Sequence, residues 1–280
     1  MKVVCSMGMS YSVLMSTYAG ENPDFLRKSM KSVFNQTVST NNFVLVCDGV
    51  LTPPLENVIK NFKRRYGSIL CIVRMPKNLG LPIALNIGLA NCLYEVVARM
   101  DSDDIAHPAR MERQLAEMDG IDILGSSVIE FATTLNDLKT QRKTPLNRCE
   151  IIEFAKRRNP FNHPSVMYRK SKVLEAGGYE QFSLCEDYQL WVKMIMAGCN
   201  VKNLKEPLLY MRVGSGLYKR RGGVKYFLTM FKFRRWLKNV GFCGQKDFVI
   251  SMLYHAFSCF SPSFVRRYFY EKFLREKFLA

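Results

Sequence analysis

Three acidic residues follow an apolar run in the segment Arg99-Met100-Asp101-Ser102-Asp103-Asp104. In an extended chain, residues i and i+2 point to the same side, so Asp101 and Asp103 can face one ligand. Carboxylates this close repel each other unless a cation lies between them, and hard oxygen ligands suit Mg²⁺ or Mn²⁺. The alternative is that Asp103 and Asp104 only cap a following helix. The spacing therefore indicates a divalent metal site, with helix capping as the open alternative.

Polar residues also follow three other apolar runs of the first half. They are Ser16-Thr17-Tyr18, Asp48-Gly49 and Asn78-Leu79-Gly80. Each of these is ordinary for a turn or loop when taken alone. The carboxyl ends of consecutive parallel strands converge on one crevice, however, and together these residues predict a polar pocket of nucleotide size.

The elements that must position these residues alternate between strand and helix. Five β-branched apolar runs recur with spacings of about 25–30 residues, which leaves room for helices and is typical of repeated βαβ units. Helices are predicted over 25–35, 81–93 and 107–118. Residues 1–131 thus predict an open, largely parallel α/β sheet. The predicted strands are 12–16, 43–47, 69–74, 96–100 and 121–131.

The pattern changes from residue 147 onward. We expect a helix over 148–158, a strand over 166–169 and a helix over 186–197. A glycine-rich cationic loop spans 214–223. Beyond it, aromatic and basic residues alternate in three predicted amphipathic helices, over 225–239, 247–260 and 263–278.

Positive charge is concentrated at the C-terminal end. The 280 residues include 41 Lys and Arg against 24 Asp and Glu, which gives a net charge of +17. Hydrophobic residues make up 48% of the chain, and this content excludes a mainly disordered chain. Residues 218–280 hold 14 Lys and Arg against 3 Asp and Glu, and 17 of the 34 aromatic residues. Helices that combine apolar aromatic residues with many cations are typical of proteins that bind an anionic membrane. The alternative is that this tail packs onto the rest of the protein.

Basic residues interleaved with aromatics are also found in nucleic-acid-binding proteins. The sequence shows no helix-turn-helix, zinc-finger or RNP pattern, and the acidic crevice would repel a phosphate backbone without a metal. We therefore predict no nucleic-acid partner. The nine cysteines include no C-x-x-C pair and indicate reduced thiols in a cytosolic protein. No window approaches the roughly 20 apolar residues that span a bilayer, so we predict a soluble or peripheral protein.

Six sequence elements stand together in one order along the chain: Ser16-Thr17-Tyr18, Cys47-Asp48-Gly49, Asn78-Leu79-Gly80, Arg99–Asp104, Pro108–Gln114 and Cys185-Glu186-Asp187-Tyr188. In the order and spacing of these elements, the chain resembles the family 2 glycosyltransferases of the GT-A fold, and among them bacterial enzymes that build O-antigen, capsule or exopolysaccharide repeat units. The resemblance covers about residues 10–215. It implies a Rossmann-like, mostly parallel sheet flanked by helices, with a nucleotide-sugar half over 10–131 and an acceptor half over 132–217. Residues 218–280 would form a helical membrane-association tail.

The resemblance also implies roles for individual residues on the donor side. Thr17 and Tyr18 would hold the nucleobase, and Asp48 would accept its ring N–H. Asp101 would contact the ribose, and Asp103, with Asp101, would bind the Mn²⁺ or Mg²⁺ that bridges the donor diphosphate. Further donor contacts are expected from Asn78 and from Arg212, which alternatively belongs to a solvated basic loop.

On the acceptor side, the resemblance implies that Asp187 is the general base, because an inverting displacement needs a carboxylate that deprotonates the acceptor hydroxyl. Glu186 and His163 would contact the acceptor. The alternatives are that Glu186 and Asp187 only decorate a helix N-terminus, and that His163 is a satisfied structural histidine. A histidine found after the last sheet segment in many relatives is missing from Tyr210–Ser215.

The implied reaction is inverting transfer of a hexose, glucose or galactose, from a UDP-sugar. The product would be a β linkage to GlcNAc or GalNAc on undecaprenyl diphosphate, in the synthesis of O-antigen or another surface polysaccharide. The enzyme would act as a peripheral protein on the cytoplasmic face of the inner membrane. The alternatives are a nucleotidyltransferase that uses the same metal and diphosphate site, and a basic nucleic-acid-binding protein.

Overall fold

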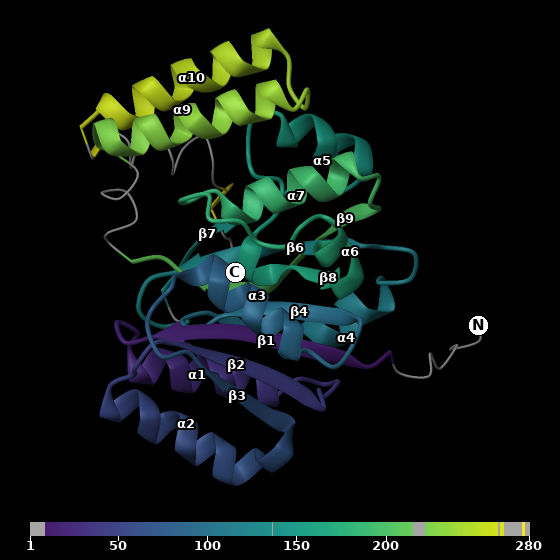
Figure 1. The fold of residues 1–280 in the computed structure, drawn as a ribbon, viewed down its shortest axis with the longest axis vertical. Helices are drawn as coiled ribbons and strands as arrows, with labels where there is room; N and C mark the ends of the chain where they lie inside the picture. The colour runs from purple at the N-terminus through teal and green to yellow at the C-terminus, as the bar shows by residue number, and fades with distance from the viewer. Residues whose placement is uncertain (1–8, 136, 215–221, 263, 266–275, 278–280) are drawn as a thin grey trace.

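The structure is a computed structural model that describes residues 9–135, 137–214, 222–262, 264–265 and 276–277. Lys219, Arg220 and Arg221, which belong to the predicted cationic loop over 214–223, lie outside these ranges, as does most of the predicted helix over 263–278. One mixed sheet forms the centre of the molecule, with α2 at one end and the α9–α10 pair at the other (Figure 1).

The sheet has the order β10-β7-β6-β8-β4-β1-β2-β3, and β9 pairs with both β5 and β6. The predicted α/β class of the GT-A type is confirmed. The strands are β1 (Tyr11–Tyr18), β2 (Asn42–Asp48), β3 (Leu70–Arg74), β4 (Val96–Asp101), β5 (Ile105–Ala106), β6 (Ile123–Phe131), β7 (Leu138–Arg142), β8 (Met167–Arg169), β9 (Val201–Arg212) and β10 (Glu276–Lys277).

The helices cover both faces of this sheet and connect its parallel strands (Figure 1). Both faces of β2 are buried, which explains its nearly continuous apolar sequence. The helices are α1 (Pro23–Phe34), α2 (Pro53–Tyr66), α3 (Leu81–Asn91), α4 (Arg110–Ala116), α5 (Arg148–Ala155), α6 (Lys170–Glu175), α7 (Glu186–Met196), α9 (Gly223–Asn239) and α10 (Gln245–Phe260).

The four strands β3, β2, β1 and β4 are parallel and in register at their carboxyl ends. Ser16 pairs with Asp101, and Tyr18 pairs with Asp48. The helix α3 packs closely onto them, because a Cβ at Gly88 would lie only 2.3 Å from the Leu14 side chain. The predicted parallel half is therefore correct, and it brings the polar strand ends to one edge.

The second half of the sheet is mixed. The short strand β8 lies between β4 and β6 and is antiparallel to both, while β7 forms an antiparallel pair with β6. Only six residues, 132–137, separate β6 from β7 in the sequence, and an antiparallel pair needs no longer connection. The expectation of a mostly parallel sheet thus holds for the first half and for the β6–β9 pair.

The predicted helices over 225–239 and 247–260 are confirmed as α9 and α10. The prediction of a helix over 263–278 is wrong at its end, because Glu276–Lys277 pairs with β7 and completes hydrogen bonds at that sheet edge. One face of α9 joins the protein core through the buried Met230, Phe233 and Leu237. None of the helices among the described residues has the length and hydropathy needed to cross a membrane.

Candidate active site

A cleft of about 510 Å³ opens at the carboxyl ends of β1, β2 and β4. We call it the acidic cleft. It brings together five of the predicted donor-site residues: Tyr18, Asp48, Asn78, Asp101 and Asp103. The lining also includes Ser16, Glu21, Gly80, Leu81 and Ser102.

Thr17 does not line this cleft, although it lies between two residues that do. Side chains alternate along a strand, so Ser16 and Tyr18 face the cleft while Thr17 points to the opposite side. The side chain of Thr17 is buried, with 1% of its surface exposed. A nucleobase contact of Tyr18, which is half exposed, fits this geometry better than one of Thr17.

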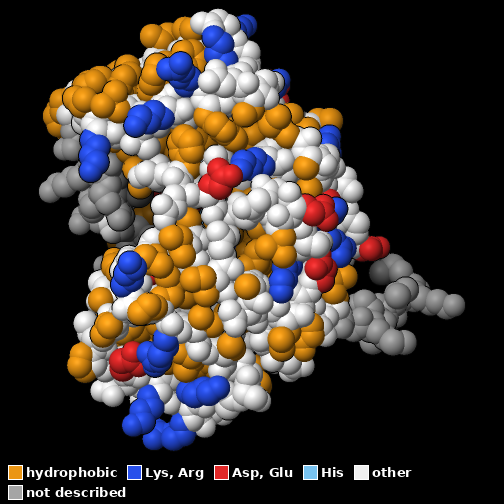
Figure 2. Space-filling model, in the orientation of Figure 1, with side chains coloured by type: hydrophobic (Ala, Val, Ile, Leu, Met, Phe, Trp, Pro, Cys, Tyr) orange, Lys and Arg blue, Asp and Glu red, His pale blue; other side chains and the backbone are white. Residues whose placement is uncertain are grey.

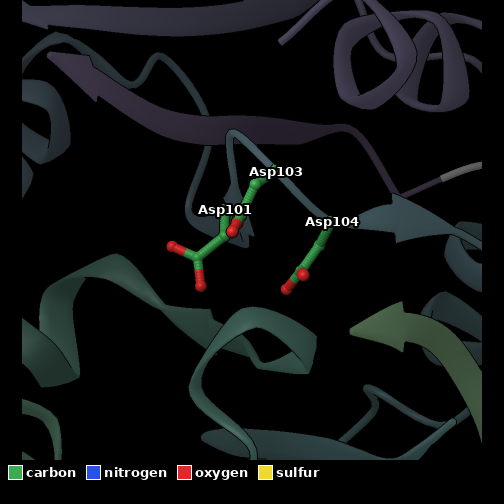
Figure 3. A group of neighbouring side chains, drawn as sticks. All are labelled: Asp101, Asp103 and Asp104. Carbon is green, nitrogen blue, oxygen red and sulfur yellow. The ribbon is translucent and has the colours of Figure 1, made fainter. Parts of the chain in front are cut away.

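Asp101 ends β4, and Asp103 and Asp104 lie in the turn that follows (Figure 3); one oxygen from each lies within 4.8 Å of the others. Asp104 is buried, and its Oδ1 accepts a hydrogen bond of 2.7 Å from the Arg212 backbone N–H. The helix-capping alternative is wrong, because the chain continues into β5 and Ala109 caps α4.

Burial and repulsion between neighbouring carboxylates both act on Asp103. Burial raises the pKa of its carboxyl to about 7, and the negative charges of Asp101 and Glu21 add to that rise. A divalent cation would relieve this repulsion, and aspartate oxygens are its preferred ligands. In addition, Oδ2 of the buried Asp104 has no hydrogen-bond partner among the described residues. The residues of this turn therefore fit a divalent metal, which Asp101 and Asp103 would hold.

Asp48 holds the wall of the acidic cleft. Its two carboxylate oxygens accept backbone hydrogen bonds of 2.8 Å from Leu79 and 3.0 Å from Gly80. The adjacent Gly49 has φ +88°, and a Cβ there would lie 2.7 Å from the Asn78 backbone nitrogen. The Asp48-Gly49 and Asn78–Gly80 segments are thus packed against each other. The base contact predicted for Asp48 would be made in addition to these bonds.

Arg212 is fixed beside the acidic turn. Its guanidinium lies 3.7 Å from the Phe25 ring and 4.4 Å from the Phe131 ring. Its Nε donates a 3.1 Å hydrogen bond to the carbonyl of Asp103, and Nη1 donates to the carbonyls of Ala132 and Thr133. These contacts support the backbone that carries the acidic residues. Arg212 is not among the residues that line the acidic cleft, and its donor contact stays a prediction.

A second cleft, of about 330 Å³, contains Asp187. We call it the arginine cleft, because its lining includes Arg142, Arg157, Arg158 and Arg234. Its walls come from the 157–164 segment, from the start of α7, and from the α9–α10 pair.

Asp187 lies in the first turn of α7, where Asn159 Nδ2 donates a 2.6 Å hydrogen bond to its Oδ2. Burial raises the pKa of Asp187, and the Asn159 hydrogen bond partly opposes this rise. The neighbouring Glu186 also has a raised pKa, because of burial and the charge of Asp187, but it does not line either of the two clefts. A carboxylate with a raised pKa is suited to accept a proton.

His163 lies in the arginine cleft with Asp187. Its Nε2 is 3.1 Å from the Tyr179 hydroxyl, and its ring packs edge-on against Trp191. Burial and the charge of Arg99 hold the pKa of His163 well below its usual range, so it is neutral near pH 7. His163 can therefore offer a hydrogen bond to a ligand but no charge.

Arg99 links the two clefts, and sequence reasoning assigned it no role. It is buried, with 1% exposed, and its guanidinium pairs with Asp101 in the acidic cleft. Its positive charge also lowers the pKa of Asp187 and of Glu186. Two of its nitrogens, Nε and Nη1, have no hydrogen-bond partner among the described residues. The signal was available, since a charged residue stands inside the apolar run Val96–Met100.

The family model "Glycosyl transferase family 2" matches residues 12–178. A relative from Haemophilus influenzae, described as an uncharacterized glycosyltransferase, is 40% identical over 96% of this chain and all of its own length. An Escherichia coli protein, the UDP-Gal:alpha-D-GlcNAc-diphosphoundecaprenol beta-1,3-galactosyltransferase, is 36% identical over 95% of this chain and 96% of its own. The amylovoran biosynthesis glycosyltransferase AmsE of Erwinia amylovora is also 36% identical, over 94% of this chain and 98% of its own.

Solved structures share the fold at low sequence identity. A mannosyltransferase from Pyrobaculum calidifontis in complex with GDP-Man and Mn²⁺ has a TM-score of 0.62 at 13% identity, covering 90% of this chain and 70% of its own. TarS 1–349 from S. aureus, in complex with UDP-GlcNAc, has a TM-score of 0.60 at 16% identity, covering 92% of this chain and 69% of its own.

Proposed function

This chain belongs to glycosyl transferase family 2, and we propose that it transfers a hexose, galactose or glucose, from a UDP-sugar to GlcNAc or GalNAc on undecaprenyl diphosphate. The transfer would invert the anomeric centre, give a β linkage and serve the synthesis of O-antigen or another surface polysaccharide. One observation carries this proposal: the buried guanidinium of Arg99 pairs with Asp101 of the metal-suited acidic cleft and also lowers the pKa of Asp187 in the arginine cleft.

The donor is proposed to lie in the acidic cleft. Tyr18, half exposed at the cleft, offers a ring face for the nucleobase, and Asn78 lies in the same lining. Asp101 and Asp103 would hold Mn²⁺ or Mg²⁺. When bound, this ion neutralises charge on the diphosphate of the leaving group. The buried Arg99 guanidinium holds the Asp101 carboxylate by an ion pair.

The acceptor is proposed to lie against Asp187. The Asp187 carboxylate takes the proton of the acceptor hydroxyl while the hydroxyl oxygen forms a bond to the anomeric carbon of the donor sugar, on the face opposite the departing UDP. The bond from the anomeric carbon to the UDP oxygen breaks, and its electron pair leaves with UDP. An α-linked donor therefore gives a β-linked product. The hydrogen bond from Asn159 orients the base, and the neutral His163 is placed to bond a sugar hydroxyl.

The first experiment is a transfer assay. UDP-Gal and UDP-Glc are each incubated with short-chain GlcNAc-diphosphate and GalNAc-diphosphate lipids, and the product linkage is read by NMR. We expect release of UDP that depends on the acceptor and on a divalent ion, with a β linkage in the product. An α linkage would contradict the inverting mechanism. Release of pyrophosphate instead of UDP would favour the nucleotidyltransferase alternative.

We also propose that the outer surface of α9 and α10 binds an anionic membrane, at the cytoplasmic face of the inner membrane. Figure 2 shows hydrophobic and basic side chains side by side over these helices, at the top of the view. Leu253 and Phe257 on α10 are 66% and 49% exposed. The buried face of α9 belongs to the protein core, so α9 would be an integral part of the enzyme that also presents an outer membrane face. The proposed boundary after residue 217 would then mark the start of the membrane-binding tail and not of a separately folded unit.

Vesicle co-sedimentation tests the membrane proposal. We expect binding to phosphatidylglycerol vesicles that weakens with salt, and weak binding to phosphatidylcholine. Replacing both Leu253 and Phe257 by Ser should reduce vesicle binding, whereas Leu93→Ser, a change at an exposed apolar residue between α3 and β4, should not. Equal loss in both variants, or binding that is indifferent to lipid charge, would contradict the proposal.

A further inference from the structure

The arginine cleft has an unusual excess of positive charge. Asp187 is the one acidic residue among the described residues that line it, against four arginines. Its two histidines add no charge near pH 7: burial and the charge of Arg234 lower the pKa of His255 to about 3, and His163 is also neutral. Asp247, outside the lining, pairs with Arg157 at 2.7 Å and balances the charge of that guanidinium.

One of the four arginines is structural. Arg234 on α9 is 4% exposed, and it donates hydrogen bonds to the backbone carbonyls of Lys156 and Arg157. A further bond of 3.3 Å goes to the Tyr188 hydroxyl. Arg234 therefore fixes the segment that carries Arg157 and Arg158 at the mouth of the cleft.

The other three arginines differ in exposure and origin but share one space. Arg157 has 43% of its side chain exposed, and Arg158 and Arg142 are partly exposed. Arg142 ends β7, and its positive charge lowers the pKa of Asp187. One guanidinium group can donate two parallel hydrogen bonds to the oxygens of a phosphate. Without such cations, an anion next to the carboxylate of Asp187 would be repelled.

The cleft also has apolar walls. Its lining includes Phe161, Leu184, Tyr226, Met230 and Tyr254. Leu184 is 60% exposed at this edge, and α9 and α10 continue from the cleft into the exposed apolar surface described above. A ligand with a charged group next to a hydrocarbon chain fits this combination better than a free ion.

We propose that the arginine cleft binds the diphosphate of an amphiphilic acceptor, with Arg142, Arg157 and Arg158 as phosphate ligands and Arg234 as the residue that positions the last two. This proposal rests on the proposed function, because it places the acceptor sugar at Asp187. The molecule then uses two chemically different ways to bind a diphosphate: carboxylates with a metal for the donor, and arginines without a metal for the acceptor.

Binding is tested first without turnover, by calorimetry in the presence of EDTA, with decyl diphosphate as the probe. Inorganic pyrophosphate and decyl maltoside are the comparison ligands. We expect decyl diphosphate to bind more tightly than either. In Arg142→Gln and Arg158→Gln its affinity should fall at least about tenfold, since a charge-assisted hydrogen bond is lost in each. The matched control is Arg64→Gln, which removes an exposed arginine from α2 at the opposite end of the molecule (Figure 1).

Unchanged affinity in both cleft variants would overturn the proposal, and so would pyrophosphate binding as tightly as decyl diphosphate, which would indicate a site for the free ion. Kinetics then separate this proposal from the proposed function. Both variants should raise KM for a GlcNAc-diphosphate lipid while leaving KM for the UDP-sugar unchanged. Arginine-dependent binding of decyl diphosphate with no sugar transfer would reject the function and keep the site. Transfer with wild-type acceptor KM in both variants would reject the site and keep the function.

Discussion

The two clefts have opposite charge and are built in different ways. The acidic cleft gathers carboxylates at the ends of consecutive parallel strands, whereas the arginine cleft gathers guanidinium groups from β7, from the segment after α5 and from α9. On the proposals above, a diphosphate would enter the first cleft only with a cation and the second without one. The difference suggests that donor and acceptor can be bound independently, and four experiments test it.

The largest effect is expected for Asp103→Asn. Loss of a metal ligand removes several kcal/mol of stabilisation of the leaving group, so turnover should fall about 10⁴-fold. Donor affinity in Mn²⁺ should fall with it, whereas decyl diphosphate affinity should be unchanged. Calorimetry with UDP and with decyl diphosphate checks both. A parallel loss of the two affinities would break the distinction between the clefts.

Asp187→Asn should lower turnover about 10³-fold, because a general base of this kind contributes between about 10² and 10⁴. The amide is close in shape and can still hydrogen-bond to Asn159, so UDP binding and the unfolding temperature should stay near wild type. Initial rates of UDP release and thermal unfolding measure these quantities. Turnover within threefold of wild type would assign the base to another residue.

Arg99→Lys should lower turnover about tenfold, which corresponds to an increase of about 1.4 kcal/mol in the activation free energy. A lysine keeps the charge but offers a single ammonium in place of the guanidinium that now pairs with Asp101. Arg99→Met removes the charge, so the pKa of Asp187 should rise and the acidic limb of the pH–rate profile should move to higher pH, whereas Arg99→Lys should leave the limb in place. If the acidic limb lay at the same pH in the wild type, Arg99→Lys and Arg99→Met, Arg99 would support only the fold.

The smallest effect is a pH shift in Asn159→Ala. As the proposed base, Asp187 would act in its ionised form, and its raised pKa means that the rate should fall as pH drops, at a higher pH than for an ordinary aspartate. The Asn159 hydrogen bond stabilises the ionised form, so its removal should move the acidic limb upward by roughly half a unit to one unit. The control Asn61→Ala, at an exposed residue on α2, should not move it. A downward shift would contradict the assignment.

The acidic cleft could be predicted from sequence because its parts are local. Each polar group follows directly on an apolar strand, and the spacing of Asp101 and Asp103 specifies one shared side. Thr17 shows the limit of this reasoning, since the exact end of a strand decides which neighbour faces the ligand. Arg99 was within reach, as a charge in a buried strand.

The arginine cleft could not be predicted in the same way. Arg142 and Arg234 are far apart in sequence, and only the packing of α9 onto the 156–158 segment places them around one space. In sequence, Arg234 looks like any other cation of a basic helix. Likewise, the contact of Arg212 with the rings of Phe25 and Phe131 depends on strand pairing across the whole sheet.

The position of α9 has a geometric consequence. One face of this helix borders the arginine cleft through Met230 and Arg234, and the opposite face carries exposed apolar residues such as Leu228. With that outer face at a lipid surface, the cleft lies only one helix diameter, about 10 Å, from the lipid headgroups. The helix would then act as a spacer that sets how far an acceptor must rise from the bilayer, and its diphosphate would meet the arginines near the level of the neighbouring phosphates.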